Sequence, residues 1–168
     1  MKLTHDNLIA FWSNKDPKIG IFSNWYTCTF KDNSGRQFNC TEQFMMYYKA
    51  KLFKDFEIAE KIMSTTDQKT MKDLGRQVHN FDEAVWNKVK YAIVYQANFF
   101  KFTQNPDLEE ALLATSGKVL VEASPYDKIW GVGMSASNND ILDTHKWRGE
   151  NLLGKILMHL RMVLICSL

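Results

Sequence analysis

Hydrophobic residues recur along this chain at the spacing of amphipathic helices. The clearest example runs from Asp82 to Phe102, where apolar side chains return every three or four residues and mark one stripe of a long helix. Three shorter helices are predicted before it, over Thr41 to Phe53, Phe56 to Met63 and Gln68 to Leu74. The polar run Ser64-Thr65-Thr66-Asp67 separates the last two and is typical of a helix cap.

The second half of the chain predicts two further helices around a long irregular segment. One helix starts at Asn105-Pro106-Asp107, where Pro106 suits the first turn, and ends near Gly117. The last helix begins after Gly149 and runs to about Leu164. Ser124 to Trp147 shows no periodic pattern. An aperiodic segment of that length inside a compact domain is either functional or a wrongly assigned element.

Short apolar runs predict a few strands. They cover Ile9 to Trp12, Val119 to Val121, and two runs, Trp25 to Phe30 and Arg36 to Phe38, on either side of the polar turn Lys31-Asp32-Asn33-Ser34-Gly35. Lys15 to Asn24 is expected to be a loop. The fold class predicted from these elements is α+β, a helix-rich single domain with a small antiparallel sheet. Without repeats or linkers, we expect one domain over residues 1–168.

Composition and charge exclude several classes of protein. A net charge of +2 gives no electrostatic footprint for long nucleic acid, so any such contact should be local, at one nucleotide. No apolar run reaches transmembrane length, and no membrane partner is expected. The three cysteines, Cys28, Cys40 and Cys166, cannot all pair, which predicts reduced thiols and a cytoplasmic, intracellular location. No pattern in the sequence specifies an oligomeric state.

Two charged residues stand in an otherwise apolar stripe of the helix from Thr41. Glu42 and Lys49 are seven residues apart, which places them on one face two turns apart. Burying either charge without compensation costs several kcal/mol, so the pair is unusual. A structural interpretation is also available. Glu42 could close a capping box with Asn39, and Lys49 could extend to solvent; spacing alone favours this interpretation.

A second candidate segment leaves the predicted strand at Ser124 and continues to Gly133. Asp127 could accept a hydrogen bond from a ribose hydroxyl or hold a water molecule, and Trp130 could stack on a base. Gly131 and Gly133 could let backbone amides approach a phosphate, although a lone G-x-G is a weak signal. The structural alternative is an Asp that caps a turn and a Trp that fills the core.

Two further segments are candidate phosphate sites. Arg148 and Asn151 flank Gly149 at the start of the last helix, where free amides beside an arginine suit an anion. Gly75-Arg76 follows the third helix, with Gly75 as a possible C-cap and Arg76 available for a pyrophosphate or a surface ion pair. The four histidines show no metal-ligand spacing, and no cofactor motif is present, so neither a metal nor a cofactor is expected.

Ordered blocks of this sequence resemble the NADAR/YbiA-like family. In the first half the blocks are Phe22-Ser23-Asn24-Trp25, Cys40-Thr41-Glu42-Gln43-Phe44-Met45-Met46 with Lys49-Ala50-Lys51, and Leu74-Gly75-Arg76. In the second half they are Trp86, Lys101-Phe102-x-Gln104-Asn105, Leu112-Leu113-x-Thr115, Leu120 to Pro125, Asp127-x-x-Trp130-Gly131-x-Gly133, Trp147-Arg148-Gly149-x-Asn151-Leu152-Leu153-Gly154 and Leu157-Met158-x-x-x-Arg161. They span about residues 11–164. One departure is Tyr26-Thr27-Cys28, which replaces a Pro-containing stretch common in the family.

The resemblance implies a helix-rich α+β fold and hydrolysis of N-glycosidic bonds in an ADP-ribose-type pocket. It implies two substrate classes, namely ADP-ribosylated guanine in nucleotides or DNA, and the small phosphoribosylamino-pyrimidine intermediates of riboflavin synthesis. We favour the first class. By the family match, the catalytic residues are Glu42, Lys49 and Asp127, and the substrate-binding residues are Asn24, Trp25, Gly75, Arg76, Trp130, Gly131, Arg148 and Asn151.

Both substrate classes join ribose to an exocyclic amino nitrogen, and such a bond can break in two ways. A carboxylate can steady an oxocarbenium-like carbon while an acid protonates the leaving amine. Alternatively, the sugar opens to an imine and a lysine exchanges into it. We hypothesise Lys49 as nucleophile, Glu42 as acid and base, and Asp127 on the ribose hydroxyls or water. The rival interpretations are a non-catalytic ADP-ribose or NAD reader and a scaffold whose charges only cap helices.

Overall fold

The computed structural model describes residues 3–167, which fall into two compact units. The central unit is Asn24–Asn105, and the terminal unit combines the residues up to Ser23 with those from Pro106 onward. Each unit is described by itself. The helix-rich α+β fold class predicted from the sequence is confirmed.

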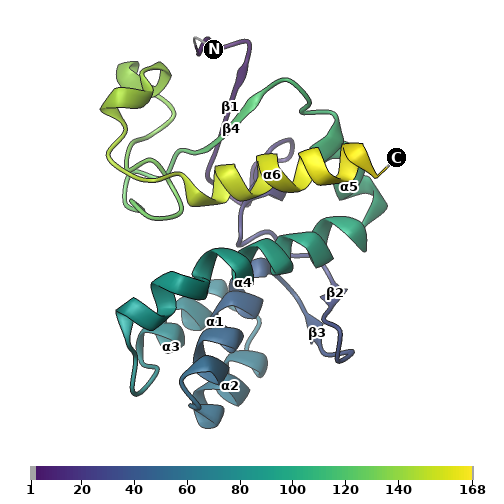
Figure 1. Ribbon diagram of the computed structural model, residues 1–168, viewed down its shortest axis with the longest axis vertical. Coiled ribbons are helices and arrows are strands. Elements are labelled where there is room, and N and C mark those ends of the chain that lie inside the picture. The colour runs from purple at the N-terminus through teal and green to yellow at the C-terminus, as the bar shows by residue number, and fades with distance from the viewer. Residues whose placement is uncertain (1–2, 168) are drawn as a thin grey trace. The chain divides into compact units, whose positions relative to one another are not determined.

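The central unit contains a short hairpin and four helices (Figure 1). The hairpin pairs β2 (Phe30–Lys31) with β3 (Gln37–Phe38) and is antiparallel, as predicted. The helices are α1 (Thr41–Leu52), α2 (Phe56–Met63), α3 (Gln68–Arg76) and α4 (Glu83–Thr103). Helix α1 lies against the other three, so more than one of its faces is buried.

Side chains at the helix starts explain why these elements begin where the sequence predicts. Asp55, Asp67 and Asp82 cap α2, α3 and α4, each by accepting a hydrogen bond from a backbone N–H of the first turn. Between β2 and β3, the Asp32 carboxylate accepts backbone hydrogen bonds from Ser34 and Arg36 at 2.8 and 2.9 Å. The predicted strand from Trp25 is much shorter than expected, since only Phe30 and Lys31 pair with β3.

The terminal unit is built on a parallel strand pair and a long helix. Strand β1 (Leu8–Phe11) pairs in parallel with β4 (Val119–Glu122), with Leu8 opposite Val119. The sequence predicts both strands but not that they pair in parallel. Helix α6 (Leu152–Cys166) lies beside β4, and α5 (Pro106–Leu113) packs against α6. Helix α5 ends four residues before Gly117, which adopts a left-handed conformation with φ of 79°.

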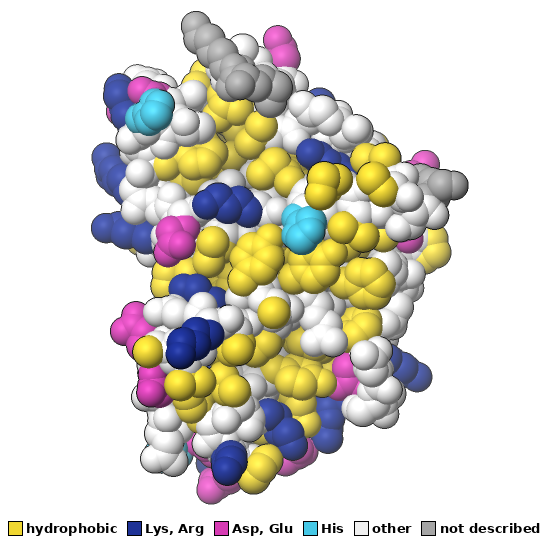
Figure 2. Space-filling view, viewed as in Figure 1, with side chains coloured by type: hydrophobic (Ala, Val, Ile, Leu, Met, Phe, Trp, Pro, Cys, Tyr) yellow, Lys and Arg dark blue, Asp and Glu magenta, His cyan; other side chains and the backbone are white. Residues whose placement is uncertain are grey.

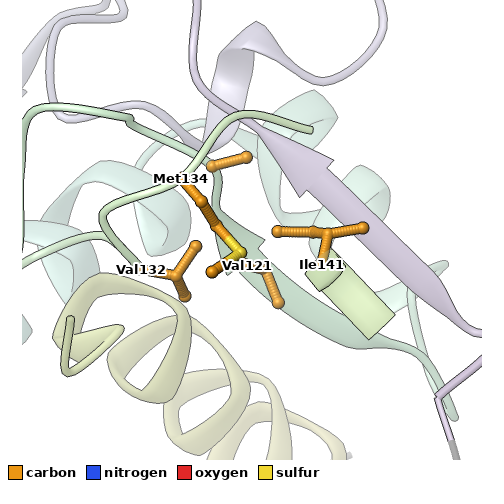
Figure 3. Packing of buried hydrophobic residues seen from close by; sticks show 5 residues of the cluster. Val121, Val132, Met134 and Ile141 are labelled. Carbon is orange, nitrogen blue, oxygen red and sulfur yellow. The ribbon is translucent and has the colours of Figure 1, made fainter. Parts of the chain in front are cut away.

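The long irregular segment after β4 has its own small core. It contains only short 3-10 helices, η2 (Asn139–Leu142) and η3 (Thr144–Lys146), and a third, η1 (Gly20–Phe22), lies in the loop after β1. Figure 3 shows Val121, Val132, Met134 and Ile141 pointing toward one another, and each is at most 2% exposed. This packing accounts for an ordered segment that shows no periodic hydrophobic pattern.

Asn151 fastens the start of α6 to β4. Its side chain accepts from Glu122 N at 3.0 Å and donates to Leu120 O at 3.0 Å, and the residue is 1% exposed. Its φ of 53° is left-handed, which places a bend immediately before the helix. A Cβ on Gly154 would collide with Leu120 O and the Asn151 amide, so helix and strand approach more closely than any larger residue allows.

On the face drawn in Figure 2, charged side chains lie mostly toward the edges, and hydrophobic side chains occupy much of the middle. Within residues 3–167, none of the helices has both the length and the apolar character required to cross a bilayer.

Replacing Asn151 with Ala should lower the free energy of unfolding by about 2–4 kcal/mol, because a buried N–H and a buried C=O lose their partners. Urea denaturation measures this loss. Asn80→Ala is the matched control, since Asn80 also has φ of 53° but is exposed. It should cost about 1 kcal/mol. Equal losses of stability in the two variants would mean that the left-handed backbone conformation, and not the pair of side-chain hydrogen bonds from Asn151 to β4, is responsible.

Candidate functional site in the helix α1 region and the Asp127 turn

The N-terminus of α1 is capped by a residue that the sequence interpretation did not choose. Cys40 is the N-cap, and its sulfur accepts from Gln43 N at 3.4 Å. Gln43 Oε1 in turn accepts from Asn39 N at 3.0 Å. The capping-box interpretation of Glu42 is therefore wrong, because Gln43 occupies the position that reaches back to the chain before the helix.

Glu42 is instead enclosed by protein. Its side chain is 4% exposed, and its backbone N–H donates to Asn24 O at 2.9 Å. Asn24 is 6% exposed, and its Oδ1 is buried without a hydrogen-bond partner in the described part of the chain. The same holds for Oγ1 of Thr41, which is fully buried. Buried polar oxygens usually have partners, so this cluster is a candidate binding site for a polar ligand.

Lys49 lies on α1 and is half-buried. Its ammonium donates to Gly75 O at 2.7 Å and lies 4.2 Å from the centre of the Phe81 ring and 5.9 Å from that of Trp86. Burial lowers the pKa of Lys49 below its usual value, and the positive charge of Arg76 lowers it further. The Glu42 carboxylate acts in the opposite direction and raises the Lys49 pKa. The two charged groups of α1 therefore influence each other, as their spacing predicts.

The structure corrects the predicted C-cap role of Gly75 and shows a surface ion pair at Arg76, while their roles in substrate binding remain predictions. Gly75 is inside α3 and is not a C-cap, since the C-cap is Gln77. A Cβ at Gly75 would collide with the end of the Met46 side chain, so glycine is explained by the close approach of α3 to α1. The Arg76 guanidinium forms an exposed ion pair with Asp73 at 3.1 Å, which agrees with the surface-pair alternative.

Trp25 belongs to the same unit as Glu42 and Lys49. The ring is partly exposed, and the ammonium of Lys72 lies 5.9 Å from its centre. The backbone carbonyl of Trp25 accepts from Gln68 Nε2 at 3.2 Å, which ties this segment to the start of α3. A partly exposed indole beside a cation can stack on a base, and its role in substrate binding remains a prediction.

In the terminal unit, Asp127 organises a tight turn. Its Oδ1 accepts from Ile129 N at 2.9 Å and from Trp130 N at 2.8 Å. Ser124 Oγ accepts from Asp127 N at 3.1 Å, which fixes the other side of the turn. The structural alternative for Asp127, a turn cap, is therefore present in the structure, and its catalytic role remains a prediction. Trp130 is only partly buried and does not fill the core completely.

The predicted phosphate site on free amides at the start of α6 is wrong. Backbone N–H groups of Leu152 and Leu153 donate to Ile129 O and Trp130 O, both at 3.1 Å, and Asn151 N donates to Gly131 O at 3.1 Å. These backbone N–H groups already donate to carbonyls of the Asp127 turn, so they are not available to a phosphate. The amide oxygen and the amide nitrogen of the Asn151 side chain are both hydrogen-bonded to β4, so this side chain has a structural role.

Gly131 serves close backbone packing as well. A Cβ there would lie 2.8 Å from Glu122 O. The neighbouring Gly133 has φ of 68°, and a Cβ on it would lie 3.1 Å from the side chains of both Arg148 and Lys128. Arg148 and Lys128 are exposed, and the Cβ of Arg148 and the Cγ of Lys128 lie over this glycine, so the cationic candidates of the unit are these side chains.

Sequence reasoning missed two residues with unusual surroundings. Lys101 on α4 is fully buried, and burial lowers its pKa to about 8. It stands in a family block, but its position in an amphipathic helix gave no sign of its burial. Phe81 is 44% exposed and covers the Lys49 ammonium, although no local pattern marks it. Within residues 3–167, the structure contains no cluster of three or more His, Cys, Asp or Glu that could hold a metal ion.

The chain is similar to known proteins over the same residues that contain the motif blocks. The model of the NADAR domain family matches residues 10–165, so the chain belongs to this family. N-glycosidase R617 of Acanthamoeba polyphaga mimivirus is 46% identical over 147 residues, covering 85% of this chain and 86% of that protein. The chloroplastic riboflavin biosynthesis protein PYRR of Zea mays is 32% identical over 167 residues, which cover 92% of this chain but 25% of that longer protein.

A solved structure shows the same fold. The NMR structure of the Escherichia coli protein YbiA matches with a TM-score of 0.79 and 28% identity, and the match covers 98% of this chain and 89% of that one. The family predicted from the motif blocks is therefore confirmed by sequence and by fold.

The two interpretations of Asp127 can be separated by stability. Asp127→Ala removes the acceptor of two backbone N–H groups and should lower the free energy of unfolding by about 1–2 kcal/mol. Asp127→Asn keeps an acceptor oxygen and should lose about 0.5 kcal/mol. Thermal or urea unfolding measures both. If Asp127→Asn is as unstable as Asp127→Ala, the charge itself is required for the turn, and the variant cannot isolate a chemical role.

Proposed function

We propose that the protein hydrolyses the ribose–amine bond of ADP-ribosylated guanine, in nucleotides or in DNA, and releases ADP-ribose and the unmodified base. Its membership in the NADAR family and its similarity to a protein named N-glycosidase support a hydrolase that acts on N-glycosyl bonds. The α1 region carries the bond-breaking chemistry, which both substrate classes share, and the choice of ADP-ribosylated guanine follows the family resemblance.

The observation that carries the proposal is the pair of charged groups on one face of α1. Lys49 is an amine whose pKa is lowered by burial, so more of it is uncharged near neutrality than of an ordinary lysine. Glu42 is an enclosed carboxylate two helical turns away that acts electrostatically on this amine. A nucleophilic amine beside a proton-transferring carboxylate is the arrangement that imine exchange requires.

The reaction then proceeds in balanced steps. The sugar ring opens as its oxygen takes a proton and the C1–O bond breaks, leaving C1 doubly bonded to the base nitrogen. The uncharged Lys49 amine adds to C1, a proton passes to the base nitrogen, and the C1–N bond to the base breaks. Water adds to the lysine imine, and loss of the amine frees the sugar aldehyde, which closes again. Glu42 carries the protons, and the net change is the addition of one water.

The Asp127 turn supports a complementary role in substrate binding. One oxygen of the Asp127 carboxylate already holds the turn, which fixes the direction of the other. A carboxylate fixed in this way can accept from ribose hydroxyls or direct a water molecule. The partly exposed Trp130 offers a face for stacking, and the Arg148–Lys128 pair offers positive charge for a phosphate.

A second candidate substrate is the phosphoribosylamino-pyrimidine class of riboflavin intermediates. Arg76 is engaged with Asp73, so Arg148 is the candidate arginine that the proposal uses for a phosphate. A single cationic group suits one phosphate, whereas a pyrophosphate is better served by two. The similarity to a protein named for riboflavin biosynthesis points the same way. Incubation with each substrate in turn, with free base measured by chromatography, distinguishes the two.

Lys49→Met should abolish base release, with a loss of at least about 10³-fold in kcat, because imine exchange has no other amine to use. Borohydride added during turnover should trap an adduct at Lys49 in the wild type. Lys51→Met, which removes an exposed lysine of the same helix, is the matched control and should retain activity. Base release without any trapped adduct would favour the direct oxocarbenium route.

The same variant tests the reader hypothesis. Lys49→Met that still binds ADP-ribose, together with a wild type that never releases base from either substrate, would identify a binding module and overturn the enzymatic proposal.

The rate should depend on pH through Lys49. Because the uncharged amine is the nucleophile, the rate should rise with pH and level off below the pH at which an ordinary lysine deprotonates. Arg76→Met removes a positive charge that lowers the Lys49 pKa, so the rising limb should move to higher pH. Asp73→Asn, which removes the partner of Arg76 but keeps the guanidinium, should move the limb much less. A limb that stays in place in Arg76→Met contradicts Lys49 as the titrating group.

A further inference from the structure

The ring of Phe81 lies directly over the amine that the proposed function requires. The Lys49 Nζ is 4.2 Å from the centre of the ring, and it also contacts Gly75 O at 2.7 Å and the Trp86 ring at 5.9 Å. The face of an aromatic ring attracts a cation but not an uncharged amine. A ring in this position therefore stabilises the form of Lys49 that cannot act as a nucleophile.

Phe81 is held by a short connection between α3 and α4, which we call the strap (residues 77–82). Asp55 fixes its middle, since one carboxylate oxygen accepts from His79 N at 2.9 Å and lies 2.8 Å from His79 Nδ1. Asn80 turns the chain with φ of 53°. Asp82 then caps α4, so the strap is defined on both sides of Phe81.

The Phe81 side chain itself is less constrained than the strap. It is 44% exposed, and it contacts the ring of Phe53, whose centre lies 5.3 Å away, in an edge-on arrangement. One face covers the ammonium while much of the ring meets solvent. A side chain with this exposure can change rotamer without opening the core, because exposed side chains move on a fast timescale.

We propose that Phe81 is a positioning residue that holds Lys49 as a resting ammonium and turns aside when substrate occupies the site. This inference rests on the proposed function, in which Lys49 reacts as an uncharged amine. Displacement of the ring by a ligand removes the cation–π contact and leaves the amine beside Gly75 O. The reactive, uncharged form of Lys49 is thereby favoured only while substrate is bound.

The charged groups around Lys49 come from several elements and define what else can shift its titration. Glu42 acts from α1 itself and Arg76 from α3. The strap contributes His79, which is paired with Asp55 and directed at the start of α2. Phe81 and Trp86 present uncharged rings. Substituting Phe81 therefore leaves every one of these charges in place, which makes the aromatic face the variable that is tested.

A second lysine of α1, Lys51, is an internal control for the ring contact of Lys49. The ammonium of Lys51, two residues further along the helix, lies 4.6 Å from the centre of the Phe56 ring, and Phe56 is 55% exposed. The two lysines thus carry similar ring contacts on one helix, but Lys51 is exposed whereas Lys49 is half-buried.

The test is trace acetylation of the lysines of the whole chain across a range of pH, with each peptide quantified by mass spectrometry and folding checked by circular dichroism. In Phe81→Leu, which keeps bulk but removes the ring, the midpoint for Lys49 should fall, so that the uncharged fraction near neutrality rises about three- to tenfold. Phe81→Tyr keeps the ring and should retain the wild-type midpoint. Phe56→Leu should leave the Lys49 midpoint unchanged.

A Lys49 midpoint in Phe81→Leu that equals or exceeds that of the wild type overturns the proposal, as does an equal fall in Phe81→Tyr. This measurement uses no substrate, so it stands apart from the catalytic assignment. If the wild type releases base, the rising limb of its pH profile of kcat/KM, which reports the free enzyme, should move to lower pH in Phe81→Leu by the same amount. If the wild type releases no base from either substrate, the proposed function fails while the labelling result still decides whether the ring holds the ammonium.

Discussion

The central unit depends on one constraint, the close approach of α1 to α3. The end of the Met46 side chain fills the space where Gly75 has no Cβ, and this contact brings the Gly75 carbonyl within 2.7 Å of the Lys49 amine. At that distance the ammonium loses part of its hydration and gains one strong acceptor. Burial thus favours the uncharged amine, whereas the hydrogen bond to Gly75 O favours the ammonium. Small changes around Lys49 Nζ therefore decide its charge.

The terminal unit follows a different strategy, in which backbone groups satisfy one another. Amides at the start of α6 donate to carbonyls of the Asp127 turn, and glycines let these backbones meet. The result is a rigid frame in which few main-chain donors remain for a ligand. In the function that we propose, recognition by this unit relies on side chains, namely the carboxylate of Asp127, the indole of Trp130 and the cations of Arg148 and Lys128.

Much of the fold could be predicted from the sequence because helix caps and hydrophobic spacing are local signals. Asp82 and the stripe that follows it identify α4 to within one residue at each end, and Asp67 identifies the start of α3. The pairing of β1 with β4 could not be predicted, since more than 100 residues separate the strands and neither has a pattern that specifies direction. The Cys40 cap was missed because sulfur is an uncommon acceptor at that position.

In the candidate site, too, local features could be predicted from the sequence and contacts between distant residues could not. The spacing of Glu42 and Lys49 is a property of one helix and could be predicted. The contacts of Lys49 with Gly75 and Phe81 join residues 26 and 32 positions away, and no local pattern reports them. The close backbone packing at Gly131 and the hydrogen bonds of Asn151 to β4 were missed for the same reason. A glycine or a helix-start asparagine has the same local sequence signal whether it faces a ligand or another strand.

Several of the partners that position α1 are main-chain carbonyls. Glu42 N donates to the carbonyl of Asn24, Gln43 Nε2 donates to the carbonyls of Ile62 and Thr65 at 3.1 Å, and Lys49 donates to that of Gly75. A carbonyl offers the same oxygen whatever side chain its residue carries. Substitution of Ile62 or Thr65 therefore leaves the acceptors of Gln43 in place, whereas Gly75 has no such freedom because a Cβ there would collide with Met46.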